Sequence, residues 1–165
     1  MLSRYRDNTG KNSAGEASVM ISEKLSDFCD GVLAKGRIDA DDVHALVLDV
    51  LPDGPACRED ADTLIALDRA VPSSMEWSDY LVSAVVDFAV WTQRPTGIVD
   101  AEAARWLADS LGCGIGPTAN GARVAFETVR EAHRVDDALM AFTLDANRRA
   151  RGTIVVAPSL PARAA

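Results

Sequence analysis

Acidic residues that could bind a divalent cation follow the glycine at position 54 with the spacing of a calcium-binding loop. With Gly54 as the sixth residue of an EF-hand loop, Asp49 occupies the first position and Asp60 the twelfth. Asp53 then falls at position five, but position three is Leu51 and position nine is a cysteine. Neither supplies the oxygen ligands that calcium prefers, so a degenerate, calcium-responsive EF-hand is an alternative and not the main prediction.

A wider set of acids occupies the first turns of predicted helices. Carboxylates at helix starts that converge in space could hold a divalent cation or a basic protein surface. The competing interpretation is that each acid stabilises its own helix end, by about 0.3–1 kcal/mol. The sequence leaves both open, and the residues concerned are Asp41, Asp42, Glu59, Asp60, Asp62, Asp100 and Glu102.

Cys113 is the one residue that suggests nucleophilic catalysis. It lies in a glycine-rich segment, residues 112–121, but the nearest histidine along the chain after it is His133. No G-x-S-x-G, Walker or H-E-x-x-H motif accompanies it, and nothing around it is electropositive. A small enzyme that uses Cys113 is therefore a second alternative, and the main prediction is a protein without catalytic activity.

The elements that position these residues are expected to be helices. A short sequence pattern that is typical of helix boundaries occurs three times. Gly36, Gly54 and Gly97 are each followed, three residues later, by a residue that can cap a helix, then by an acid and later by a leucine. A glycine can take the positive φ that ends one helix, and the polar residue can cap the next. The chain is therefore expected to be a set of helix pairs.

Apolar residues at helical spacing predict an all-α protein, a single globular bundle of about seven helices. The helix expected over Ser74 to Gln93 is almost entirely apolar, which predicts a buried central helix that joins two related helix-pair halves. Ser83 and Asp87 form its one polar stripe, which is an exposed edge or a buried hydrogen-bonded site; the exposed edge is favoured. The domain is expected at 16–150, with flexible tails at 1–15 and 151–165.

Composition narrows the choice of partners. The 165 residues include 25 acids and 17 lysines and arginines, a net charge of −8. This charge repels nucleic acid and anionic lipid, and favours a protein partner or a cation. The longest apolar run has twelve residues, whereas a membrane-spanning helix needs about 20, so no membrane insertion is expected. Three widely spaced cysteines favour the cytoplasm, and a homo-oligomer stays open.

Two of the repeated phrases carry a resemblance to a known family. Asp53-Gly54-x-Ala56-x-x-Glu59 and Thr96-Gly97-x-Val99-Asp100-x-Glu102 resemble the D-G-x-[IV]-x-x-E signature of the TerB-like (tellurite-resistance) helical proteins, over Gly36 to Leu111. The resemblance implies a cytoplasmic, non-enzymatic interaction module in a stress or signalling system, with acidic metal-binding surfaces. Its signature acids, with Asp60 of the EF-hand spacing, give the candidate ligands for Ca²⁺ or Mg²⁺: Asp53, Glu59, Asp60 and Glu102.

Overall fold

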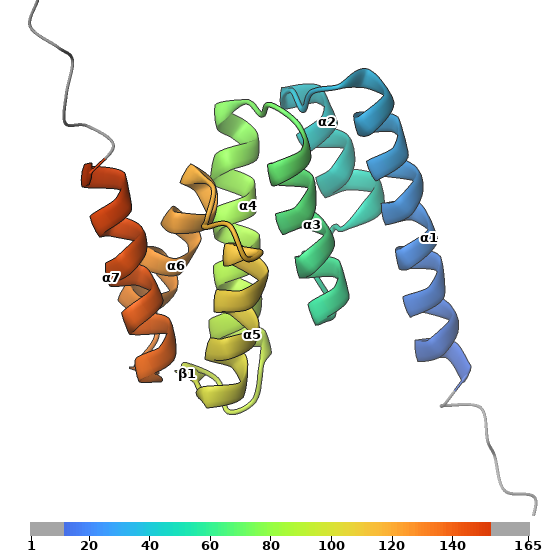
Figure 1. Cartoon of the computed structure of the whole chain (residues 1–165). Helices are drawn as coiled ribbons and strands as arrows, with labels where there is room; N and C mark the ends of the chain where they lie inside the picture. The colour runs from blue at the N-terminus through green and yellow to red at the C-terminus, as the bar shows by residue number, and fades with distance from the viewer. Residues whose placement is uncertain (1–11, 153–165) are drawn as a thin grey trace, which may run out of the picture.

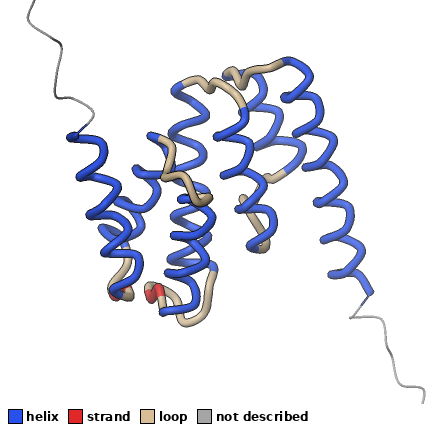
Figure 2. The backbone as a smooth tube through the Cα atoms, viewed as in Figure 1, coloured by secondary structure: helices blue, strands red, loops and turns tan. Residues whose placement is uncertain are grey.

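The computed structural model describes residues 12–152, with side chains from residue 23 to 151, and within this part of the chain it confirms the all-α fold. Figure 1 shows the helices packed side by side in one bundle, and Figure 2 shows how little strand there is. The elements are α1 (Asn12–Lys35), α2 (Ala40–Ala45), α3 (Arg58–Ala70), α4 (Met75–Asp87), α5 (Ala101–Gly112), α6 (Ala119–Glu131) and α7 (Asp137–Gly152), with the π-helical turns η1 (Leu46–Val50) and η2 (Phe88–Thr92) and the strands β1 (Ile98–Val99) and β2 (Arg134–Val135).

The described helices extend past the predicted domain boundaries at both ends. Helix α1 begins at Asn12, inside the tail expected over residues 1–15, and α7 continues to Gly152. A single interior glycine such as Gly15 costs a helix only about 1 kcal/mol, which does not end a helix of 24 residues. Residues 1–11 and 153–165, which make up most of the two expected tails, lie outside the described residues.

The repeated glycines end helices or turns as the sequence predicts. Gly36, Gly54 and Gly97 have φ angles of 75°, 77° and 77°. After the first and third of them, Asp39 and Asp100 cap α2 and α5, with their carboxylates accepting hydrogen bonds from backbone N–H groups of the first turn. These helix starts are therefore fixed by local sequence.

The loops that follow Gly36 and Gly97 each pair with a second loop, which the sequence analysis did not predict. Ile38, after α1, forms an isolated parallel bridge with Ser73, just before α4. In the same way β1, after η2, pairs in parallel with β2, just before α7, with Ile98 opposite Arg134. Each paired segment is at most two residues long. A segment this short cannot show the alternation of apolar and polar residues by which a strand is recognised in a sequence.

This matched pairing shows two related halves of four helices. The backbone N–H of Ser74, at the start of α4, donates to the Ile38 carbonyl at 3.0 Å, and the N–H of Asp136, at the start of α7, donates to the Val99 carbonyl at 2.9 Å. Helices α1, α2, α3 and α4 thus correspond to α4, α5, α6 and α7. Helix α4 is the last helix of the first half and the first of the second.

Helix α4 has the central position that its composition predicts. It packs against α2, α3 and α6 and lies in the middle of the bundle in Figure 1. Trp77, Val85 and, in η2, Phe88 are almost completely buried. The polar stripe is an exposed edge: Ser83 and Asp87 are both exposed.

Replacing Gly97 with alanine should destabilise the fold more than the same change at the equivalent Gly36. Both glycines have positive φ, which costs an alanine about 1–2 kcal/mol. At Gly97 a Cβ atom would also lie 2.6 Å from Nδ1 of His133, whereas at Gly36 it would meet nothing within 4 Å. We expect losses of about 2 kcal/mol or more for Gly97→Ala and about 1 for Gly36→Ala in urea unfolding. Equal losses would contradict the close contact between the two loops.

Candidate functional site

Two of the four predicted metal ligands make separate local contacts, and the other two are exposed. The buried Asp60 carboxylate accepts a hydrogen bond from the Ala56 backbone N–H at 3.0 Å, and Glu102 forms an ion pair with Arg58 at 2.7 Å. Glu59 and Asp53 are exposed. Among the side chains that the structure describes, residues 23–151, no three His, Cys, Asp or Glu are grouped in a way that could hold a metal ion.

The cap that the sequence places at Cys57 is not formed by its side chain. Cys57 does precede α3, but its side chain makes no capping hydrogen bond, so that expectation is wrong. A thiol is a weak acceptor. The Asp60 carboxylate accepts from the Ala56 N–H, which lies before the cap position. A hydrogen bond from its own backbone N–H, followed by one from Cys57, lowers the pKa of Glu59, as expected for an acid in the first turn of a helix.

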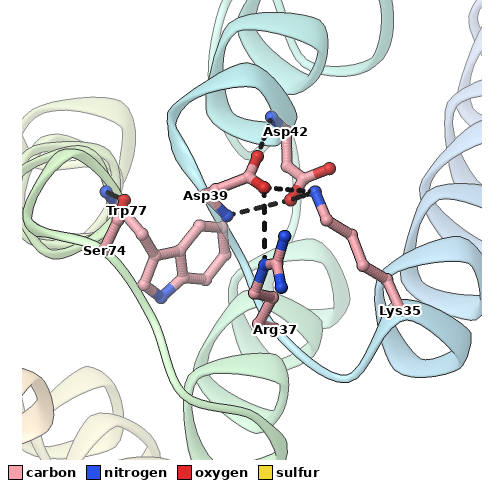
Figure 3. A network of polar contacts seen from close by, with 6 residues as sticks. All are labelled: Lys35, Arg37, Asp39, Asp42, Ser74 and Trp77. Carbon is pink, nitrogen blue, oxygen red and sulfur yellow. Dashed lines mark hydrogen bonds and ion pairs between the residues drawn. The ribbon is translucent and has the colours of Figure 1, made fainter.

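The acids at the start of α2 are neutralised by a lysine at the end of α1. Figure 3 shows Lys35 between the carboxylates of Asp39 and Asp42, and its Nζ lies 2.9 Å from Oδ2 of Asp42. The hydrogen bond from Lys35 is the main cause that lowers the pKa of Asp39, and the same bond raises the pKa of Lys35. These acids therefore serve their own helix start and do not extend into a shared site.

An arginine lies against a tryptophan and a carboxylate where α3 meets α5. The Arg58 guanidinium lies 5.3 Å from the ring centroid of Trp106, and its Nη1 is 2.7 Å from Oε1 of Glu102. On the same helices, the Trp106 indole N–H donates to Asp62 at 3.0 Å, and Ser110 also donates to Asp62. Glu102 and Asp62, expected at a shared acidic surface, thus hold α3 to α5.

The structure separates the two residues on which the Cys113 alternative depends. Cys113 is exposed just after α5, in the loop before α6, whereas His133 lies in the loop after α6. Thirteen residues of α6 lie between the two loops, and a helix of that length spans about 20 Å. His133 packs edge-on against Trp91, with ring centroids 5.6 Å apart. His133 is therefore not placed to act as a general base for the Cys113 thiol.

A buried aspartate joins α3, α4 and α6, and sequence reasoning missed it. The Asp68 carboxylate accepts hydrogen bonds from the Trp77 indole N–H at 3.0 Å, the Asn120 amide at 2.6 Å and the Thr118 hydroxyl at 2.6 Å. Asp68 is 9% exposed. Three donors satisfy the carboxylate without a cation, so this network is structural. Its only sequence signal is an aspartate at an apolar position of the α3 stripe, next to Leu64, Ile65 and Leu67.

A groove between α4 and α6, with a volume of about 430 Å³, has mixed polar and apolar lining. We call it the α4/α6 groove. One wall carries Asp79, Ser83, Asp87 and Trp91, four residues apart along α4 and η2, and the other carries Arg123, Glu127, Arg130 and Glu131 of α6; Val82 and Val86 complete the lining. A volume of this size accommodates several side chains of a bound segment.

The two walls run in the same direction, and ion pairs neutralise part of them. Arg123, in the first half of α6, pairs with Asp79, near the start of α4, at 2.9 Å. Arg130 pairs with Glu127 at 2.7 Å within α6. Among the described side chains, neither Asp87 nor Glu131 has an ion-pair or hydrogen-bond partner for its carboxylate. The groove therefore has an end closed by the Arg123–Asp79 pair and an open end with unpaired negative charge.

Comparison with known proteins found no match to this chain among family models, curated proteins or solved structures. The TerB-like resemblance therefore rests on the two short phrases of the sequence. Among the described helices, none is long and apolar enough to cross a membrane.

Proposed function

We propose that this chain is a non-enzymatic, TerB-like helical module that binds a partner protein through the α4/α6 groove, in the cytoplasm and as part of a stress or signalling system. The observation that carries the proposal is the groove itself, which combines Val82, Val86 and Trp91 with four carboxylates and only two arginines. Binding surfaces typically combine an apolar contact area with charges complementary to the partner. The occupant that fits is a segment with apolar and basic side chains.

The charge of the whole chain supports the same partner chemistry. A net charge of −8 accelerates the encounter with a basic segment and disfavours acidic ones. A divalent cation is the weaker version of the proposal, because no described set of three ligands supports it. In that version Asp53, Glu59, Asp60 and Glu102 would bind Ca²⁺ or Mg²⁺.

Amide NMR shifts should reveal the groove as the binding site. We expect the peptide acetyl-Leu-Arg-Leu-Arg-Leu-amide to shift amides of residues 79–91 and 123–131, and its glutamate counterpart to shift none of them. The effect should weaken between low salt and 0.5 M NaCl, because exposed charges are screened.

Two outcomes of this titration would contradict the proposal. One is the absence of groove shifts with the arginine peptide; the other is equal shifts with both peptides. A parallel titration with MgCl₂ and CaCl₂ tests the cation version: shifts confined to residues 53–60 and 100–102 would support it in place of the groove.

A further inference from the structure

The open end of the α4/α6 groove carries two carboxylates, and that of Glu131 lies at the unfavourable C-terminal end of a helix. Glu131 is the last residue of α6, and Asp87 is one turn before the end of the helix that η2 extends to Thr92. Carbonyl groups make the C-terminal end of a helix negative, so an acid there is destabilising unless a cation is near. Neither carboxylate has such a partner among the described side chains. A positively charged group would find an electrostatically favourable position between them.

Trp91 gives the same end of the groove an aromatic surface. It is 40% exposed, an unusual state for the largest side chain, and it lines the groove together with Asp87 and Glu131. The indole is supported from the neighbouring loop by the ring of His133. Tryptophan is the best aromatic partner for a cation, and a planar cation can stack on it while its N–H groups reach a carboxylate.

The interface of α3 and α5 contains the same combination of a tryptophan and a carboxylate, and there an arginine of the chain itself contacts both. There Arg58 lies 5.3 Å over the Trp106 ring and 2.7 Å from the Glu102 carboxylate. The open end of the groove has the tryptophan and the carboxylates but no arginine in contact with them. We propose that this end binds a single arginine side chain of the partner protein, stacked on Trp91 and hydrogen-bonded to Glu131 and Asp87. The inference rests on the proposed function, because it names the group that the groove selects.

A series of three peptides tests whether the site selects arginine. The arginine peptide above is compared with versions in which lysine or citrulline replaces both arginines. Citrulline keeps the length and planar shape of arginine, but it has no charge, and a carbonyl oxygen replaces one of the guanidinium nitrogens. We expect at least about tenfold weaker binding with citrulline, as loss of hydrogen bonds between charged groups implies, and about threefold to tenfold weaker binding with lysine. The Trp91 indole N–H should shift at lower concentrations of the arginine and lysine peptides than of the citrulline peptide.

Variants then locate the selection at the open end. Trp91→Leu and Glu131→Gln should each weaken arginine-peptide binding about tenfold, whereas Asp41→Asn, an exposed acid of α2, should leave it unchanged. Groove shifts that are equal for arginine and citrulline, or that persist at full strength in Glu131→Gln, would overturn this inference and leave the proposed function standing. Absence of groove shifts with every peptide would overturn both.

Discussion

Phe88→Ala is expected to lower the free energy of unfolding by about 3–5 kcal/mol. Phe88 is 1% exposed, and its ring meets Trp106 edge-on with centroids 5.9 Å apart, so the truncation leaves a cavity between η2 and α5 that neighbouring side chains cannot fill without moving. A typical domain is stable by only about 5–15 kcal/mol, so this one change removes a large share. Urea unfolding followed by circular dichroism measures the loss.

The matched control for Phe88 is Phe126→Ala. Phe126 is also on a helix, α6, but it is 47% exposed, so its truncation should cost less than about 1 kcal/mol. If the two variants unfold at the same urea concentration, helix α4 with η2 is not the centre of the core, and the arrangement of the two halves around it is wrong.

Asp68→Ala is expected to cost about 3 kcal/mol or more. The change removes the acceptor of three hydrogen bonds and leaves the Trp77 indole N–H buried without a partner, which alone costs about 1–3 kcal/mol. Asp68→Asn keeps one oxygen acceptor, so its loss should be smaller. Both are measured by urea unfolding, with Asp109→Ala, an exposed acid of α5, as a control that should change stability by less than about 0.5 kcal/mol.

A loss below about 1 kcal/mol for Asp68→Ala would show that the three donors find water or other acceptors. The Asp68 network would then not be what holds α3, α4 and α6 together. The readout is independent of any ligand, so it tests the scaffold of the α4/α6 groove separately from its binding.

Features that depend on a few consecutive residues could be predicted from the sequence. The positive φ of Gly36, Gly54 and Gly97, and the caps at Asp39 and Asp100, follow from the conformational freedom of glycine and from short side chains that reach the next turn. The exposed stripe of Ser83 and Asp87 follows from helical periodicity. These are interactions between neighbours in the chain, so the information for them is local.

Features that join distant segments could not be predicted in the same way. Asp68 and Asn120 are 52 positions apart, and nothing in an asparagine near a predicted helix start indicates that it donates to a buried aspartate. The α6 wall of the groove was missed for the same reason: the sequence shows the stripe of α4 but not which helix faces it. The acids at the helix starts were expected to converge in space. Instead, Lys35 pairs with Asp42, Arg58 pairs with Glu102 and Trp106 donates to Asp62, at separate places in the structure.

Because α4 belongs to both sets of four helices, we expect neither set to be stable without the other. A break in the loop after η2 would leave the first set with the α6-facing side of α4 uncovered, and the second set without its first helix. The bridges Ile38–Ser73 and Ile98–Arg134 lie just before α4 and just after η2, so the same continuous helix connects the loop pairs of both halves. We therefore expect the two halves to unfold in one cooperative transition.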